Sequence, residues 1–251
     1  MHNLSMKFLQ RCHLVLLPIV LAAACQSPEA SSSENEPLPM IAVSNMLHPP
    51  FSSRDENGQA VGVEVELIEE AARRLGREVE WIELSFGELI DAVAAGEADV
   101  AASTLGITEA RAKIVAFSAP YFSTGIVALT RTADGEPRTL GELAGKLVAT
   151  ERGTTTVEAT AKRIPEARRV LDKQEGRTWQ EMLITGDIDA IVLDGSHAEK
   201  FMTDGGTPFH VIAEPLRIEK FGLAVHQGNA ELLEALNDVI AQYGVVCEKA
   251  L

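Results

Sequence analysis

One pattern, which the chain contains twice, constrains the fold more than any other feature of the sequence. Residues 85–100 and residues 178–190 each contain, in the same order, a short amphipathic helix, a glycine, an acid-x-Asp triplet and the start of an apolar strand. The glycines, Gly96 and Gly186, stand where a helix ends in a left-handed backbone conformation, which glycine adopts at little cost. The chain is therefore expected to contain two related α/β units.

Both helices are expected to begin with a capping box. Ser85 is followed three residues later by Glu88, and Thr178 is followed by Glu181. In this arrangement the hydroxyl accepts a hydrogen bond from a free backbone N–H of the first helical turn, and the carboxylate accepts one from the cap residue. Thr139 and Glu142 repeat the spacing before a further predicted βα unit, so the same start signal occurs three times.

Each repeated unit brings a charged residue close to the carboxyl end of a strand. The strand at residues 100–103 leads toward Thr108 and Arg111, and the strand at residues 190–193 ends on Asp194. Open α/β sheets bind their ligands at the carboxyl ends of strands. One cationic and one anionic group in such positions indicate a site that holds a zwitterion.

The remaining predicted elements also alternate between strands and helices, which is typical of α/β architecture. The pattern predicts strands at residues 41–44, 79–84, 146–150 and 221–225, a turn at 54–58, a helix that ends at Gly76, and a final helix from the cap residue Asn229 to Tyr243.

The composition excludes several classes of function. The 251 residues include 22 Lys and Arg against 37 Asp and Glu, a net charge of −15, and no basic stripe that would neutralise nucleic-acid phosphates. The sequence has neither a metal-ligand spacing nor a phosphate-binding glycine loop, so we expect no metal and no cofactor. The acidic surface indicates a soluble protein and gives no information about the ligand.

The first 24 residues have the pattern of a signal peptide. Lys7 and Arg11 precede an apolar stretch at residues 14–21, which is too short to span a bilayer. Small residues then lead to Cys25, a pattern similar to that of bacterial lipoproteins, in which this cysteine is lipidated. Residues 25–39 have the composition of a flexible tether. The alternative is ordinary signal cleavage beside an incidental cysteine.

Six short motifs occur in order across residues 48–155, and together they resemble one protein family. This family comprises the bacterial extracellular solute-binding proteins of the amino-acid type, which capture ligands for ABC importers. The motifs lie at residues 48–51 (His-Pro-Pro-Phe), 62–66 (Gly-Val-Glu-Val-Glu), 96–100 (Gly-Glu-Ala-Asp-Val), 107–111 (Ile-Thr-Glu-Ala-Arg), 117–121 (Phe-Ser-Ala-Pro-Tyr) and 153–155 (Gly-Thr-Thr).

The resemblance covers residues 40 to about 243 and implies an α/β, two-lobe, periplasmic-binding-protein-like (type II) fold. Each lobe is a mixed sheet flanked by helices, and the ligand cleft lies between the lobes. The implied first part of lobe 1 is residues 40–124, and lobe 2 is residues 125–217. Residues 218–251 return to lobe 1, and the crossovers lie near residues 121–125 and 216–221.

The resemblance also assigns roles to the two charged residues. Arg111, expected in the first turn of a helix capped by Thr108, would anchor a ligand carboxylate. A cation is unfavourable at that end of a helix dipole unless it holds an anion there. Asp194 would hold the ligand ammonium. The structural alternatives are a surface or interlobe salt bridge for Arg111 and a helix N-cap for Asp194.

Five further residues are implied in the site. Thr154 and Thr155 belong to the lobe 2 loop that closes on the carboxylate, or they cap the helix that follows. Phe86 and His48 are expected to pack on the ligand side chain; the alternatives are core packing and a surface position. Asn45 lies where relatives carry an acid or an amide, and because it is neutral it argues weakly against lysine or arginine as the ligand.

The sequence departs from the family pattern at Gly106, where relatives usually have Ser or Thr. A lost hydrogen bond to a charged group costs about 1.5–3 kcal/mol, so affinity would fall roughly tenfold to a hundredfold. The alternatives are that Thr104 or water replaces the hydroxyl, or that the pocket takes a bulkier ligand. A dicarboxylate or another small organic anion would still use Arg111.

The predicted function is capture of a small polar ligand, most often an amino acid in this family, for the ABC permease of the inner membrane. The protein is expected to be a monomer in the cell envelope, held to the membrane by its lipid only, and not an enzyme. Two alternatives remain: an enzyme similar to cyclohexadienyl dehydratases, which share this scaffold but carry an acid near Thr154, and a sensory or other small-carboxylate binder.

Overall fold

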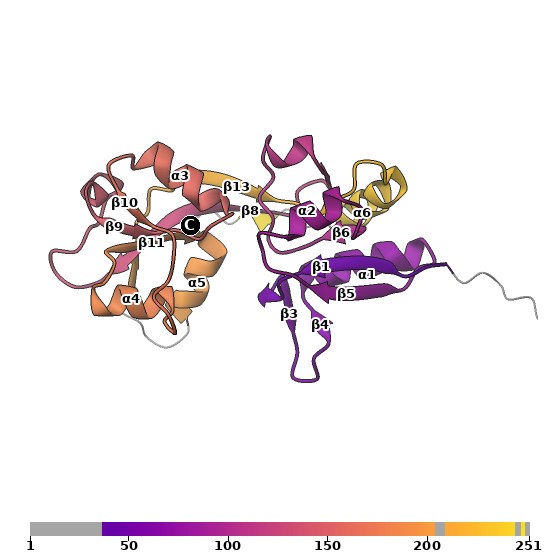
Figure 1. Cartoon of the computed structure of the whole chain (residues 1–251), viewed down its shortest axis with the longest axis horizontal. Coiled ribbons are helices and arrows are strands. Elements are labelled where there is room, and N and C mark those ends of the chain that lie inside the picture. The colour runs from indigo at the N-terminus through magenta and orange to yellow at the C-terminus, as the bar shows by residue number, and fades with distance from the viewer. Residues whose placement is uncertain (1–36, 204–208, 244–246, 249–251) are drawn as a thin grey trace, which may run out of the picture. The chain divides into compact units, whose positions relative to one another are not determined.

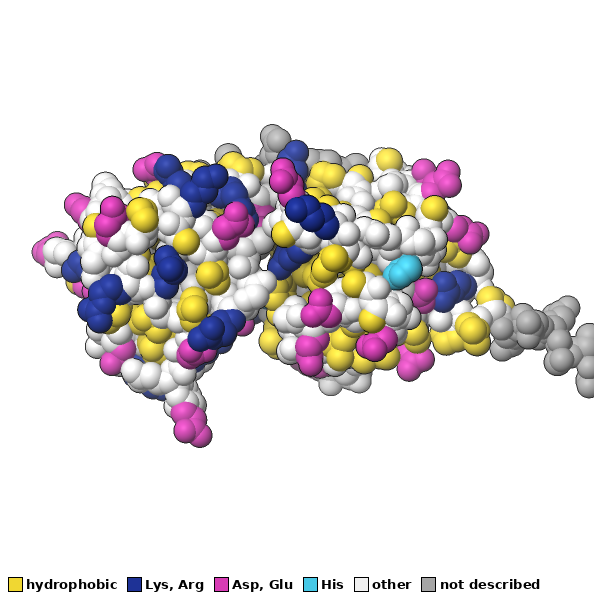
Figure 2. All heavy atoms as spheres, turned by 45° about the horizontal axis from the view of Figure 1, so that its top comes forward, with side chains coloured by type: hydrophobic (Ala, Val, Ile, Leu, Met, Phe, Trp, Pro, Cys, Tyr) yellow, Lys and Arg dark blue, Asp and Glu magenta, His cyan; other side chains and the backbone are white. Residues whose placement is uncertain are grey.

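The computed structural model describes residues 37–203, 209–243 and 247–248. The predicted signal peptide, the lipidation site Cys25 and most of the tether lie outside these residues. In the described part of the chain, no helix is long and apolar enough to cross a membrane. On the face drawn in Figure 2, acidic and basic side chains are interspersed.

The first sheet is mixed and is covered by helices on both faces (Figure 1). Residues alternate along its strands, so that Met40 and Ala42 pack with helices α1 and α6, whereas Val43 and Ala101 pack with α2. The strand order is β5 (Val79–Glu83), β1 (Met40–Ser44), β6 (Val100–Ala101), β14 (Ala224–Val225) and β7 (Ala116–Phe117), with α1 at Val63–Arg74, α2 at Leu89–Ala94 and α6 at Ala230–Tyr243.

The second sheet has seven strands built around the ten-residue strand β8. Ile126 and Ala128 pack on the side of α3, and Val127 and Leu129 pack on the side of α4 and α5. The strand order is β10 (Arg168–Val170), β9 (Leu147–Ala149), β11 (Ala190–Asp194), β8 (Phe122–Arg131) and β12 (Phe209–Val211). Two further strands, β13 (Arg217–Phe221) and β15 (Cys247–Glu248), also pair with β8. The helices of this lobe are α3 (Thr155–Arg163), α4 (Trp179–Thr185) and α5 (Gly195–Thr203).

The two sheets define the two lobes of the expected fold, which we call lobe 1 and lobe 2. Strands of the first sheet come from residues 40–117 and 224–225, and those of the second from residues 122–221 and 247–248. β8 and β13 pair antiparallel along their length, from Arg217 opposite Ile126 to Phe221 opposite Phe122. These are the segments predicted as crossovers, and the sequence boundaries proposed for the lobes remain a prediction.

A small third sheet extends from lobe 1. The strands β2 (Leu47–His48), β3 (Ser52–Arg54) and β4 (Ala60–Val61) pair antiparallel in this order. The predicted turn at residues 54–58 joins β3 to β4, with Gly58 at a positive φ of 78°. This sheet carries His48, which lines the cavity described below.

The three predicted capping boxes have different outcomes. The boxes Thr178–Glu181 on α4 and Thr139–Glu142 on the 3-10 helix η2 (Leu140–Leu143) form completely. At Ser85 the prediction is wrong in part. Glu88 accepts the Ser85 N–H at 3.0 Å, but the chain forms a turn first, and α2 begins only at Leu89. Both predicted helix ends are confirmed, because Gly96 and Gly186 have positive φ angles of 75° and 82°.

Two other predicted elements differ from the structure. The late strand at residues 221–225 is broken, because Phe221 pairs in the lobe 2 sheet and Ala224 pairs with Ala101 in the lobe 1 sheet. Arg111 lies in a single 3-10 turn, η1 (Arg111–Lys113), and not in an α-helix. Its backbone N–H does bond to Thr108 Oγ1 at 3.2 Å, but so short a turn has little dipole, so that part of the reasoning does not hold.

Candidate ligand-binding cleft

One cavity of about 300 Å³ is lined by residues of both lobes. Its size suits a small molecule. All nine residues that the sequence predicted as ligand contacts line this one cavity. From lobe 1 these are Asn45, His48, Phe86, Thr104, Gly106 and Arg111, and from lobe 2 they are Thr154, Thr155 and Asp194.

Arg111 is held so that its guanidinium reaches across the cleft. Nη1 donates to Gly106 O at 2.9 Å within lobe 1, and Nη2 donates to Gly153 O at 3.1 Å in lobe 2. The guanidinium carbon lies 5.6 Å from the centre of the Phe86 ring, a cation–π distance. Burial lowers the pKa of Arg111, but an arginine remains charged at any physiological pH. The lobes thus meet at a cation with N–H donors left for a ligand.

Thr154 and Thr155 open helix α3, and the hydroxyl of Thr154 is not its cap. That hydroxyl donates to Glu151 O at 2.7 Å and lies 2.6 Å from the hydroxyl of Thr156. Thr154 occupies the N-cap position without a side-chain cap bond. The predicted capping role of this side chain is therefore wrong, and the first backbone amides of α3 remain available to an anion.

Asp194 fulfils the helix-capping role that the sequence offered as its alternative. Its Oδ1 accepts hydrogen bonds from the Ser196 hydroxyl and from the backbone N–H of His197, the latter at 3.1 Å, at the start of α5. Its Oδ2 accepts from His197 Nδ1 at 2.6 Å. Burial acts to raise the pKa of Asp194, but the hydrogen bonds and the charge of His197 outweigh it and lower the pKa to about 2. A carboxylate can accept about four hydrogen bonds, so one position remains for a ligand.

A chain of hydrogen bonds crosses the cleft from Asp194 to lobe 1. His197 Nε2 lies 2.6 Å from His48 Nδ1, and His48 Nε2 lies 3.1 Å from the Asn45 amide nitrogen. The Ser103 hydroxyl donates to Asn45 Oδ1 at 2.6 Å. The chain is satisfied when the Asn45 amide donates to His48, His48 Nδ1–H donates to His197 and His197 Nδ1–H donates to Asp194. His48 and Asn45 therefore have defined partners in the cleft.

The pKa values of the two histidines in this chain of hydrogen bonds are shifted in opposite directions. Burial, followed by the charge of His197, lowers the pKa of His48 to about 4. Burial also acts to lower the pKa of His197, but the hydrogen bond and charge of Asp194 raise it overall. The sequence did not identify His197, although its position three residues after Asp194 on a helix start was the available signal.

Gly106 is explained by a residue that the sequence analysis missed. A Cβ atom on residue 106 would lie 2.1 Å from Glu219 Oε1, which is far inside contact distance. Glu219 is 6% exposed and belongs to β13, more than a hundred residues along the chain. A Ser or Thr side chain at position 106 would therefore require the carboxyl group of Glu219 to move.

A second buried carboxyl group holds the loop that carries Thr104. Glu64 is fully buried, and its Oε1 accepts the backbone N–H groups of Ser103 at 3.2 Å and Thr104 at 2.8 Å and the hydroxyl of Tyr121. Its Oε2 accepts the Ser52 hydroxyl at 2.7 Å. These bonds stabilise Thr104 at a positive φ of 48°, which is unusual for threonine.

Thr150 is a further lining residue that the sequence did not identify. Its hydroxyl is buried at the end of β9 and has no hydrogen-bond partner among the described residues. A buried hydroxyl without a partner is uncommon. Among the described residues, no group of His, Cys, Asp and Glu is arranged to hold a metal ion.

Comparisons with known proteins identify the family. The sequence profile of the bacterial extracellular solute-binding proteins, family 3, matches residues 40–244. The chain is 30% identical over 196 residues to the L-cystine-binding protein TcyJ of Escherichia coli (strain K12), covering 78% of this chain and 73% of that protein. It is also 30% identical over 220 residues to the "Probable histidine-binding protein" of Campylobacter jejuni, covering 81% and 85%.

The solved structures agree. The arginine-bound form of truncated ArgBP from T. maritima superposes with a TM-score of 0.71 at 35% identity and covers 82% of this chain and 96% of that one. The chain therefore belongs to the bacterial extracellular solute-binding proteins, family 3. This confirms the predicted family, the type II fold and a solute-binding function. These relatives are named as binding proteins and not as enzymes, in agreement with the expectation for this chain.

Proposed function

We propose that this protein captures an amino acid in the cleft and delivers it to an ABC importer. The observation that carries the proposal is the single cavity lined by Arg111 from lobe 1 and Asp194 from lobe 2. Such a cavity offers a cation for the α-carboxylate and an anion for the α-ammonium. The names of the relatives, which include cystine-, histidine- and arginine-binding proteins, support an amino acid as the ligand class.

In the proposed complex, the carboxylate is bound by Arg111 and by the first backbone amides of α3. These amides follow Thr154, whose side chain leaves them free. The ammonium takes the remaining acceptor position of Asp194, and Phe86 and His48 pack on the ligand side chain. Arg111 also bonds to Gly153 O in the opposite lobe, and its remaining N–H donors can bind the ligand without loss of that contact.

The lipid anchor and the location in the cell are also part of the proposal. We infer that Cys25 is lipidated and holds the protein, as a monomer, at the periplasmic or extracellular face of the cell envelope. The basic, apolar and small-residue pattern of residues 1–25 and the tether-like residues after it support this inference. The word extracellular in the family description is consistent with it.

A small carboxylate without an ammonium is the second candidate ligand. The observation that favours it is the close pairing of Asp194 with His197, at 2.6 Å, which already supplies this carboxylate with a strong donor. A carboxylate ligand would depend on Arg111 and would need nothing from Asp194. The two candidates therefore differ in a way that substitutions can measure.

A thermal-shift screen of amino acids and small carboxylates tests the proposal first. A ligand present at a hundred times its dissociation constant adds about 2.7 kcal/mol of stability, which raises the melting temperature measurably. Calorimetry on Arg111→Ala and Asp194→Ala then follows with the best compound of the screen. Loss of one member of a desolvated charge pair costs roughly 2–5 kcal/mol of binding energy.

The two variants separate the candidate ligands. An amino acid should lose affinity in both variants, whereas a simple carboxylate should lose it mainly in Arg111→Ala. Arg152→Ala is the matched control, because Arg152 lies near the same loop but pairs with Asp172 on the surface. Unchanged binding by Arg111→Ala would show that the cleft is not the ligand site.

A further inference from the structure

We propose that Glu219 is a ligand-binding residue that completes the carboxylate end of the cleft in place of the hydroxyl that Gly106 lacks. This inference rests on the proposed function, because it assumes that a ligand carboxylate is held by Arg111. It adds a residue from the connection between the lobes to a site otherwise built from the lobes themselves.

The position of Glu219 carries the inference. It lines the ligand cavity together with Gly106, Arg111 and Thr155, although it lies on β13, the strand that pairs with β8 between the lobes. The point where a Cβ of residue 106 would stand is 2.1 Å from Glu219 Oε1 and 3.2 Å from Thr155 Cγ2. The carboxyl group therefore occupies the space in which a Ser or Thr side chain at position 106 would lie.

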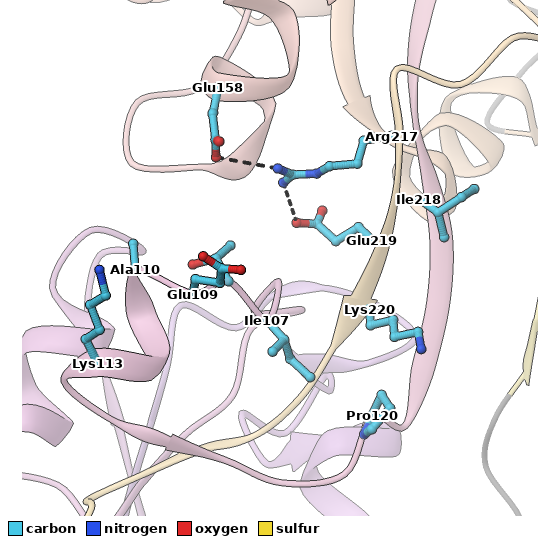
Figure 3. Close-up of a pocket in the computed structure, with 11 residues that line it drawn as sticks. Ile107, Glu109, Ala110, Lys113, Pro120, Glu158, Arg217, Ile218, Glu219 and Lys220 are labelled. Carbon is cyan, nitrogen blue, oxygen red and sulfur yellow. Dashed lines mark hydrogen bonds and ion pairs between the residues drawn. The ribbon is translucent and has the colours of Figure 1, made fainter. Parts of the chain in front are cut away.

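Glu219 also lines a second cavity, of about 850 Å³ (Figure 3). There Arg217 Nη2 lies 3.5 Å from Glu219 Oε1, and Arg217 Nη1 lies 3.5 Å from Glu158 Oε2 on α3. These are long ion pairs, and Arg217 divides its contacts between two carboxylates. The same oxygen, Oε1, is therefore close both to the position of a Cβ on residue 106 and to the guanidinium of Arg217.

The chemistry of a buried carboxyl group suits the missing role. Burial raises the pKa of Glu219, against the hydrogen bond from Thr155 and the charges of Arg217 and Arg111, while the charge of Asp194 acts with burial. The protonated acid donates its O–H to a ligand carboxylate, as a Ser or Thr hydroxyl would. The ionised form repels that carboxylate. Ligand affinity should therefore fall as the pH rises through the pKa of Glu219.

Titration calorimetry with L-histidine, L-arginine and L-cystine, between pH 4.5 and 8, tests the role of the carboxyl group. Glu219→Ala should bind the preferred amino acid roughly tenfold to a hundredfold more weakly than the wild type at the low end of this range, through loss of one hydrogen bond to a charged group. Glu219→Gln should bind more tightly than Glu219→Ala, because its amide N–H can donate. It should also lack the decrease with pH that the wild type shows.

A double-mutant cycle tests whether a hydroxyl at position 106 can replace the carboxyl group of Glu219. Gly106→Ser alone should weaken binding, because the new side chain collides with Glu219. Gly106→Ser combined with Glu219→Ala should recover at least tenfold relative to Glu219→Ala, because a hydroxyl then replaces the carboxyl. Gly141→Ser is the control, since Gly141 is exposed in lobe 2 and has nothing within 4 Å of its Cβ position. Melting temperatures show which variants are folded.

The possible outcomes distinguish a failure of this inference from a failure of the proposed function on which it rests. If the wild type binds none of the amino acids in the thermal-shift screen, the proposed function fails and the inference fails with it. If the wild type binds one of them and Glu219→Ala binds it equally well, or if the effects at positions 106 and 219 are simply additive, only the inference is wrong. A change in melting temperature without a change in affinity would show that Glu219 only holds the two lobes together.

Discussion

Replacement of Glu64 tests how the lobe 1 wall of the cleft is held. In the Glu64→Leu variant, the buried N–H groups of Ser103 and Thr104 lose their acceptor. Each unsatisfied buried donor costs about 1–3 kcal/mol, which gives a gross cost of about 2–6 kcal/mol. Leucine also removes the cost of burying a carboxyl group. We therefore expect a net loss of about 2–4 kcal/mol in the free energy of unfolding.

Glu64→Gln is the matched control for this variant. The amide oxygen can take the place of Oε1 and accept the same two N–H groups and the Tyr121 hydroxyl, while its nitrogen donates to Ser52 Oγ. Burial raises the pKa of Glu64, so the contribution of this group to the free energy of unfolding decreases as the pH rises through that pKa. Glutamine cannot titrate and should therefore remove this part of the pH dependence.

Urea denaturation followed by tryptophan fluorescence measures both variants, since Trp81 and Trp179 report on separate lobes. We expect Glu64→Gln to remain within about 1.5 kcal/mol of the wild type, because it exchanges one hydrogen-bond arrangement for another. Equal destabilisation by leucine and glutamine would mean that the charge matters and not the acceptor geometry. A leucine variant as stable as the wild type would refute the reasoning altogether.

Three further predictions concern single positions. As the pH falls from 6.5 to 4, the His48→Gln variant should lose less stability than the wild type, by up to about 3 kcal/mol. The pKa of the buried His48 is lowered to about 4, so in this pH range the folded wild type binds fewer protons than the unfolded state. Urea titrations at several pH values check this. Gly186→Ala should cost about 1–2 kcal/mol in thermal unfolding because of its left-handed backbone, whereas Gly141→Ala, at an exposed position without a positive φ, should change little. Cys25→Ser should release the protein from membranes into the soluble fraction, and sedimentation of this variant with membranes would show that no lipid at Cys25 anchors it.

The sequence predicted best what depends on neighbours along the chain. Thr178 and Glu181 form their capping box, and Gly186 ends the same helix, because each contact lies within a few residues. Asp194 lines the cavity because it ends strand β11, and Arg111 lines it from the turn that follows β6. Family motifs supplied most of the other lining residues, although their contact with a ligand remains a prediction.

What could not be predicted depends on contacts between distant segments. Glu219 meets Gly106 only because β13 pairs with β8 beside the cleft, and no local pattern indicates that contact. Glu64 lies in a recognised motif, but its four hydrogen bonds come from three separate parts of the chain. The break at Gly222 arises because the chain changes sheets there, which periodicity alone cannot show.

The position of β14 in the lobe 1 sheet has a consequence for how the chain folds. Ala224 and Val225 lie between β6 and β7, so the middle of this sheet is supplied by residues more than a hundred positions after its first strands. An emerging chain cannot complete the lobe that it begins with until lobe 2 has already been synthesised. Pairings over such long separations form slowly. Lobe 1 should therefore complete its folding only after the strands of lobe 2 up to β13 have been synthesised.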